Sequence, residues 1–238
     1  MIALSPGPRT RAALAVAAAL GLAAGLTACD PGTPRPSGGT SVPEKGQLHG
    51  TDLAGLLLPP SALPKGLKPN ADGTRNSADA VRPPSRTPVP RAAACRMLDT
   101  TAWIDAAGIG SATFAQSDAV NAAHTEEVAQ GIDTFRAGDA GRVITGLYRV
   151  LAHCARFTDT YGGNTAHVRL ARSRVHANGA DGVKAVLTAP EWEGGATLVA
   201  LRGGDAVVTV QYDYGHAGRG AAAVRWAGRI AAKVRAAG

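Results

Sequence analysis

The sequence predicts an α+β fold: one domain with an antiparallel sheet of about five to six strands, flanked by helices and stapled by a single disulfide. Three observations predict it. Strand-like segments follow one another on short turns in the carboxyl-terminal half, and consecutive strands on short turns must pair antiparallel. Two long segments, 139–157 and 219–236, have the apolar spacing of amphipathic helices. Of three cysteines, one is assigned to lipidation, which leaves one pair.

The chain begins with the pattern of a bacterial lipoprotein leader. Arg9 and Arg11 precede an apolar run that ends in Leu26-Thr27-Ala28-Cys29. The run is too short to cross a membrane, which takes about 20 apolar residues. We therefore predict that residues 1–28 are a lipoprotein signal peptide and that Cys29 carries the lipid, which anchors the chain on the extracytoplasmic face of the cell membrane. The alternative is an ordinary secretory peptide in which Cys29 is incidental.

The mature chain divides into a tether and one domain. Residues 29–49 are rich in Pro, Gly, Ser and Thr and predict a flexible tether from lipidated Cys29. Residues 50–238 are long enough to bury a full core and predict a single sensor-like α+β domain. The formal charge of the whole sequence is +7, of which Arg9 and Arg11 in the leader contribute two. The mature chain therefore carries about +5, which suits an acidic envelope polymer or a lipid surface. The arginines form no motif that reads bases, so nucleic acid is excluded as a partner.

The two remaining cysteines predict a disulfide. Once Cys29 is assigned to lipidation, Cys95 and Cys154 are left as a pair in an oxidising compartment. Cys154 continues the apolar stripe of the helix at 139–157 and therefore faces the core. The predicted bond staples this helix to the segment that starts at Cys95. The alternative is two separate buried thiols.

The amino-terminal half of the domain predicts short elements. We predict a short helix at 51–58 and a turn at 61–66. Residues 68–90 contain many prolines and polar residues, and they predict a long irregular loop. A second short helix is predicted at 99–107, and Gly108 stops it.

The remaining elements follow from hydrophobic periodicity. Residues 111–116 and 124–135 alternate and predict two strands, joined as a hairpin around 117–123. The helix at 139–157 has the strongest pattern in the chain. After a turn at 161–164, four strands and a final helix at 219–236 are predicted. These strands are 165–175, 182–188, 196–201 and 205–212.

The order of these motifs resembles a known family. The segment Leu57 to Gly66 has the pattern Leu-Leu-x-Pro-x-x-Leu-Pro-x-Gly, Cys95 to Asp99 has Cys-x-x-Leu-Asp, and a later helix ends in Cys with Phe157 close behind. With the strands and closing helix, this order resembles the extracytoplasmic sensor domain of PknH-type kinases and many actinobacterial lipoproteins. The resemblance covers about residues 50 to 237. It implies an antiparallel sheet flanked by helices, a groove for an unidentified ligand and no catalysis.

The chain departs from this family in two ways. It supplies one disulfide pair where the kinase domain has two, and it carries no kinase domain of its own. Direct signalling by this chain is therefore not predicted.

No motif of a catalytic or metal site is found. The sequence has no Gly-x-Ser-x-Gly elbow, no His-Glu-x-x-His and no Gly-Lys-Ser/Thr loop. No histidine lies three or four residues from another, as compact metal sites often require. We therefore predict no catalytic residues, no metal ligands and no cofactor, and the ligand-binding residues stay unknown. The histidines are His49, His124, His153, His167, His176 and His216.

Two charged clusters were weighed as sites. Glu191 and Glu193 flank Trp192 in the manner of an acid pair beside a sugar platform, but they lie in a turn, and glycoside hydrolysis needs a rigid pair about 5 to 9.5 Å apart. The strand at 165–175 carries three arginines that are candidates for an anion site. A solvated face is favoured, because alternation places the last two on one side of the strand. These arginines are Arg169, Arg172 and Arg174.

Two functional hypotheses follow. In the first, the domain binds an envelope lipid, glycan or peptide in a groove between the sheet and the amino-terminal half, bordered by the strand at 205–212 and the loop before Cys95. In the second, it is an accessory protein that docks on another envelope protein. That version predicts an exposed apolar patch of Trp192, Tyr212 and Tyr214. A hydrolase is the third hypothesis, and it requires titratable residues clustered in one cleft.

Overall fold

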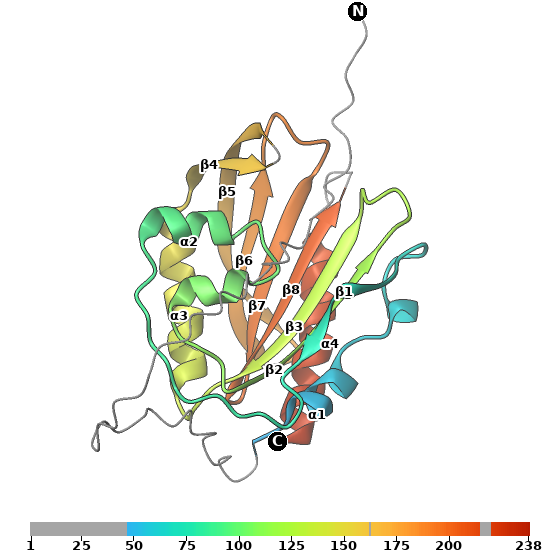
Figure 1. Cartoon of the computed structure of the whole chain (residues 1–238), viewed down its shortest axis with the longest axis vertical. Coiled ribbons are helices and arrows are strands. Elements are labelled where there is room, and N and C mark those ends of the chain that lie inside the picture. Colours follow the sequence, from blue (N-terminus) through green and yellow to red (C-terminus); the bar gives the residue numbers. More distant parts are fainter. Residues whose placement is uncertain (1–46, 162, 215–219) are drawn as a thin grey trace, which may run out of the picture.

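The computed structural model describes residues 47–161, 163–214 and 220–238 (Figure 1). Cys29, the predicted signal peptide and most of the predicted tether lie outside these residues, as does His216. None of the helices in the described ranges combines the length and the apolar character that crossing a bilayer requires.

One antiparallel sheet of eight strands forms the centre of the domain, in the order β1-β2-β3-β8-β7-β6-β5-β4. The predicted α+β class and antiparallel pairing are confirmed. The predicted count of five to six strands is wrong, because the two strands at the edges of the sheet, β1 and β4, were not predicted. The strands are β1 Lys68–Asn76, β2 Thr113–Val120, β3 Glu127–Thr134, β4 Arg156–Tyr161, β5 Asn164–Ala177, β6 Ala180–Thr188, β7 Gly195–Gly203 and β8 Ala206–Tyr214.

Strand β1 lies in the segment predicted to be a loop. Its sequence is Lys-Pro-Asn-Ala-Asp-Gly-Thr-Arg-Asn, it is almost wholly exposed, and its register with β2 shifts between Asn70 and Arg75. An edge strand pairs on one side only and tolerates proline, so it needs no alternating apolar pattern. Strand β4 was assigned to the end of the predicted helix at 139–157. That helix ends at His153, and the chain then turns to pair with β5.

Four α-helices cover the two faces of the sheet. They are α1 Gly50–Leu56, α2 Arg91–Met97, α3 Asp139–His153 and α4 Gly220–Ala237. Helix α2 was not predicted, because its first residues directly follow the proline-rich segment and folded structure was predicted only from Cys95 onward. The predicted helix at 99–107 is a short 3-10 turn, η2 Trp103–Ala107, which ends at Gly108 in the left-handed conformation (φ 71°). A second short turn, η1 Pro60–Ala62, follows α1.

The helices enclose two cores, one on each face of the sheet. Helices α1 and α4 pack on one face, where Tyr212 lies edge-on to Trp226 with ring centroids 5.1 Å apart. Helices α2 and α3 pack on the other face, where Leu147 lies against the sheet residues Val183 and Leu198. Figure 1 shows α2 and α3 together on one side of the sheet and α4 on the opposite side.

The predicted disulfide is present. It joins Cys95 of α2 to Cys154, the residue that follows α3, with the Cα atoms 5.4 Å apart. Both cysteines are buried. The two residues are 59 positions apart in the chain, and closing a loop of this size stabilises a fold by about 4 kcal/mol on the chain-entropy estimate. The bond fixes α2 to the end of α3, as the sequence predicted for Cys95 and its helix partner.

The folded part includes Gln47 to His49, which the sequence assigned to the tether. The Gln47 amide donates to the Thr134 hydroxyl (3.3 Å), and the Thr113 hydroxyl donates to the Leu48 carbonyl (2.8 Å). Leu48 also packs against the core under α1. The folded domain therefore begins three residues earlier than predicted, with a segment held by these hydrogen bonds and by the packing of Leu48.

Candidate functional site

One half of the sheet carries a polar surface on the side that bears α3. We call it the polar face. Its members are contributed by four neighbouring strands, β1, β2, β3 and β8. The helices of this side mainly contact the other half: α2 packs on β4, and α3 packs on β5, β6 and β7 and reaches β8 at the boundary. The residues of the polar face are Arg75, Gln116, Asp118, Asp133, Thr209, Gln211 and Asp213.

The strand register shows that these side chains share one face. Arg75 pairs with Gln116, Gln116 with Gly131, and Gly131 with Thr209. Thr209 pairs in turn with Ala200, which belongs to the core under α3. Because directly opposite residues in a sheet point the same way, the row lies on the α3 side. Arg75 also donates from Nε to the Gln116 Oε1 at 3.2 Å.

Glycine at position 131 keeps this row flat. A Cβ atom there would lie 2.6 Å from the Thr209 hydroxyl and 3.8 Å from an Asp133 carboxylate oxygen. Any side chain at position 131 would therefore collide with Thr209 and cover the row. The small residue leaves the polar groups of β2 and β8 without a bulky neighbour between them.

A second row contains buried polar groups. Asp118 pairs with Ala129, Ala129 with Gln211, and Gln211 with Leu198. Asp118 is 6% exposed and Gln211 is 2% exposed. The Gln211 Nε2 donates to both carboxylate oxygens of Asp213, at 3.2 and 3.1 Å. Within the described ranges, the Gln211 Oε1 accepts no hydrogen bond, and a buried acceptor without a donor is costly.

Two carboxylates and two arginines lie at the end of the polar face near η2. The pKa of Asp133 is raised to about 7, chiefly by burial and also by the charge of Asp105, whereas the hydrogen bond from Ser111 and the charges of Arg82 and Arg75 lower it. Burial also raises the pKa of Asp105, against the charges of the same two arginines. Asp133 is therefore half protonated near neutral pH, so it can donate as well as accept a hydrogen bond.

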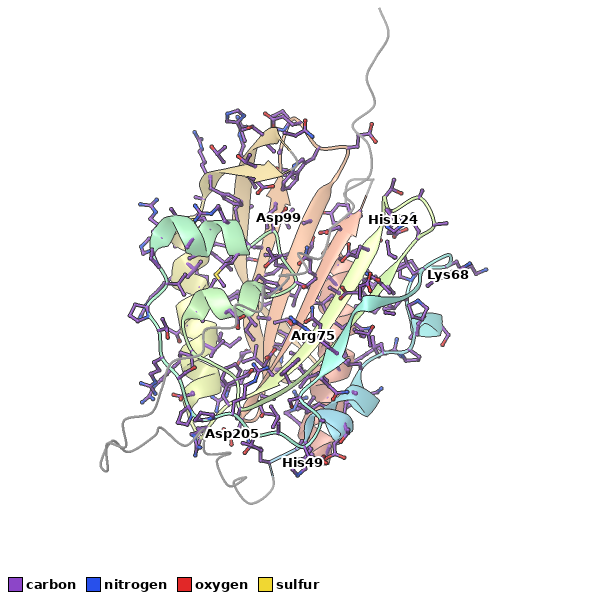
Figure 2. The ribbon with its side chains drawn as sticks, in the orientation of Figure 1. His49, Lys68, Arg75, Asp99, His124 and Asp205 are labelled. Atoms are coloured by element: carbon purple, nitrogen blue, oxygen red, sulfur yellow. A yellow bond between two sulfur atoms is a disulfide. The ribbon has the colours of Figure 1, made fainter. Side chains whose placement is uncertain are left out.

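The segment between β1 and α2 borders this end. The Arg82 guanidinium lies 4.6 Å from the centre of the Phe114 ring, and its backbone N–H donates to the Ala112 carbonyl at 2.8 Å. Figure 2 shows Arg75 toward the middle of the sheet, whereas Lys68 of the same strand lies at its outer edge. The bulge of β1 also covers Asp118, because a Cβ at Gly73 would lie 1.7 Å from its carboxylate.

Comparison with known proteins bears on the fold. No protein-family model matches the chain, and no curated protein matches it. The chain is similar to the crystal structure of the extracellular domain of PknH from Mycobacterium tuberculosis, with a TM-score of 0.56 and 16% sequence identity, over 79% of this chain and 95% of that one.

The fold is that of the PknH extracellular domain. The resemblance predicted from the order of motifs is thus confirmed at the level of the fold. The predicted antiparallel sheet, flanking helices and disulfide are all present in this fold. The polar face includes residues of β8 and is bordered at one end by the segment between β1 and α2, and these are the two segments that the sequence predicted to border a groove.

The polar face contains residues that the sequence analysis did not single out. In β8, Thr209 and Gln211 alternate with the apolar Val208 and Val210, which is the ordinary pattern of a strand with one solvated side. Only their burial and their register with β2 and β3 distinguish them. A signal was present in Gln211, because a long amide in the centre of a valine-rich strand is unusual.

The aromatic patch predicted for docking is not formed. Tyr212 and Tyr214 are buried in the core under α4, with ring centroids 5.2 Å apart. Trp192 packs on the opposite core, under α3. The three rings therefore lie on different faces of the sheet. The prediction is wrong because alternation along β8 points both tyrosines inward.

The clusters weighed from the sequence have local partners. Glu191 accepts hydrogen bonds from the backbone N–H of His167 (3.0 Å), and its side chain lies 2.8 Å from the His167 ring. The hydrogen bond to the His167 side chain lowers the pKa of Glu191. Arg172 and Arg174 do share one strand face, where both guanidinium groups lie over the Tyr148 ring, at 4.0 and 4.6 Å.

The other histidines lie apart from one another. His49 precedes α1, His124 lies in the β2–β3 turn, and His176 contacts Asp181 at 2.8 Å. Within the part of the chain that the structure describes, no three His, Cys, Asp or Glu side chains are grouped closely enough to hold a metal ion.

Proposed function

We propose that this protein is a lipid-anchored, non-catalytic sensor-like domain that binds a polar envelope ligand on the polar face. One observation carries the proposal: Gln211 is 2% exposed, and its Oε1 accepts no hydrogen bond from the described residues. Buried amides in folded proteins nearly always satisfy both ends. A ligand that donates to this oxygen would complete the row.

The chemistry of the polar face favours a glycan or a peptide over a lipid. Its side chains offer carboxylate, amide, hydroxyl and guanidinium groups, from Asp118, Gln116, Thr209 and Arg75. Apolar side chains are concentrated on the other half of the sheet, under α3. A hydroxyl-rich or amide-rich ligand can satisfy such groups, whereas an acyl chain would leave them unpaired.

Hydrogen exchange with soluble peptidoglycan fragments, which carry both sugar and peptide, tests the proposal. We expect amides of β2, β3 and β8 to gain protection, and Arg75→Gln or Gln211→Leu to abolish the gain. Arg149→Gln on the exposed side of α3 is the matched control for the charge and should behave as the unsubstituted chain. Protection confined to α4, with no effect of either polar-face variant, would contradict it and favour docking through the helix.

A second candidate function is hydrolysis. The observation that favours it is the grouping of Asp105 and Asp133, since carboxylates with raised pKa values are typical of general acids. Asp133→Asn separates the two functions, because it keeps the shape and hydrogen-bonding size of the residue. If the same fragments are cleaved by the unsubstituted chain and only bound by Asp133→Asn, the hydrolase is correct.

Anchoring is tested at Cys29. We expect Cys29→Ala to leave the chain unprocessed or released into the medium, because it removes the only predicted acylation site. Membrane fractionation and metabolic labelling with a fatty acid measure the result. A variant that stays acylated and membrane-bound would exclude Cys29 as the lipidation site.

A further inference from the structure

A pocket of about 360 Å³ lies beside the disulfide, at the edge of the sheet farthest from β1. Arg91 and Arg96 of α2 line it from one side, and His153 ends α3 above it. Arg156 and Phe157 of β4 line the remaining side. The Cys95–Cys154 bond joins α2 to the residue that follows α3, and β4 begins two residues later. The bond therefore holds the ends of these three elements close together.

The pocket is strongly cationic. Three of its lining residues are arginines, a fourth is histidine, and none is acidic. Arg91 donates from Nη2 to the His153 carbonyl at 2.7 Å. Within the described ranges, none of the three arginines forms an ion pair with a carboxylate. No carboxylate of the described residues therefore pairs with these charges.

The strand pairing adds to this excess of positive charge. Arg156 of β4 lies directly opposite Arg169 of β5 in the antiparallel register. Like charges directly opposite each other on neighbouring strands destabilise the pair. The nearby acid, Asp159, follows on β4 but does not line the pocket. Because Phe157 pairs with Val168 of the core under α3, Arg156 and Arg169 lie on the other face of β4 and β5, and their charges meet at the border of the pocket rather than inside it.

We propose that this pocket binds a phosphate or sulfate group. Guanidinium groups bind such oxyanions bidentately and carry their charge at every physiological pH. Arg96 and Arg156 both line the pocket and are exposed, and within the described residues neither forms an ion pair, so both side chains can turn toward one anion. The Phe157 ring and the aliphatic part of the lining suit an organic phosphate ester. The source is either a phospholipid headgroup or a soluble phosphate ester.

The site is separate from the polar face. The polar face occupies β1, β2, β3 and β8, whereas the pocket is built from α2, the end of α3 and β4. Failure of one site therefore leaves the other untouched. A domain held close to a membrane by a lipid would have phosphate groups within reach, but the pocket itself does not depend on that anchor.

Calorimetric and NMR titrations test the site. The full chain carries Cys29→Ser, so that no attached lipid can bring it to a vesicle, and has the Cys95–Cys154 bond formed. Inorganic phosphate and glycerol phosphate are the soluble probes, and phosphatidylglycerol vesicles, with phosphatidylcholine vesicles as reference, are the membrane probe. We expect phosphate to shift amide signals of α2 and β4, and Arg96→Gln with Arg156→Gln to weaken binding at least about tenfold.

A matched control and the opposite outcomes complete the design. Arg229→Gln changes the same charge on the exposed side of α4 and should bind as the Cys29→Ser chain does. Binding of both soluble phosphate and phosphatidylglycerol vesicles, lost together in the double variant, identifies a headgroup site. Binding of the soluble probes alone identifies a soluble ester. No shift in α2 or β4, or equal weakening by Arg229→Gln, overturns the proposal, because general positive charge would then explain the binding.

Discussion

The two halves of the sheet differ on the side that bears α3. In the β4–β7 half, rows of Val183, Ala185 and Leu187 face Ala200, Leu198 and Ala196, and all are buried under α3. In the β1–β3 half, which β8 completes, the same rows continue as Thr209 and Gln211, Gly131 and Ala129, and Gln116 and Asp118. One sheet thus passes from an apolar core to a polar surface within two strands.

This difference separates the part of the sheet that stabilises the fold from the part that carries the proposed ligand site. The apolar half holds the disulfide and, on the α3 side, a continuous layer of buried side chains such as Leu187 and Leu198, so this side of it stabilises the fold. The polar half contains an orphan acceptor and an acid with a raised pKa, and both cost stability. Costs of this kind are concentrated at functional sites in natural proteins. The following predictions test that separation, from the largest expected effect to the smallest.

Removing the disulfide should give the largest loss. The Cys95→Ala, Cys154→Ala variant should unfold with a free energy lower by about 4 kcal/mol, because the unfolded chain regains the entropy of the closed loop. Urea denaturation measures it. Hydrogen exchange should show α2 and the end of α3 opening first, while β2 and β3 stay protected. Equal loss of protection in both halves would contradict the separation.

Truncating a core residue of the apolar half should be nearly as damaging. Leu198 is fully buried and pairs directly with Gln211 across the boundary between the halves. Leu198→Ala should cost about 2 to 5 kcal/mol through lost burial and a residual cavity. The measurement is again the free energy of unfolding in urea. A loss below about 1 kcal/mol would show that α3 does not make this half a tightly packed core.

The polar half should confer a pH dependence. Asp133 has a pKa of about 7 in the folded chain against the usual 3.8 of an aspartate, so the folded state binds more protons between these two pH values. The contribution of Asp133 to stability should therefore be fully present below about pH 4 and be lost as pH rises to about 7, with a slope of at most about 1.4 kcal/mol per pH unit. Thermal denaturation across this range measures it after subtraction of the Asp133→Asn profile. Identical profiles for the two chains would disprove the shift.

Replacing the orphan amide should give the smallest effect. Gln211→Leu removes the unpaired Oε1 together with the two hydrogen bonds to Asp213. The two contributions oppose each other, so stability should change by less than about 1 kcal/mol. Leu198 and Gln211 are paired across the boundary between the halves, so comparing Gln211→Leu with Leu198→Ala tests one residue of each half at the same place in the sheet. A large loss would mean that Gln211 is structural and that the polar face is ordinary core.

The parts of the fold with a local signal were predictable. Local hydrophobic periodicity predicts the elements that show it within a short stretch of sequence. These are α3, the four strands β5 to β8 and the closing helix α4. The disulfide followed from counting cysteines and from the compartment. The PknH-like fold followed from the order of motifs and was confirmed by the structure comparison.

The edge strands and α2 could not be predicted in the same way. Strand β1 has no apolar alternation, because it is an exposed edge strand that pairs with β2 on one side only. Strand β4 begins three residues after α3 ends, so its alternation is hidden in the tail of the helix pattern. Helix α2 follows a proline-rich segment and is fixed by its disulfide and by contacts with η2.

The sequence by itself determined the types of element and the cysteine pair, because periodicity and cysteine chemistry act over short distances or by simple pairing. The tertiary structure alone decided which polar residues meet. Gln116 and Thr209 are distant in sequence and become neighbours only through Gly131, by the register of β3 between β2 and β8. Arg96 and Arg156 line one pocket because α2 packs on β4 beside the disulfide. Register and crosslinking are long-range constraints, and a single sequence does not encode them in any one window.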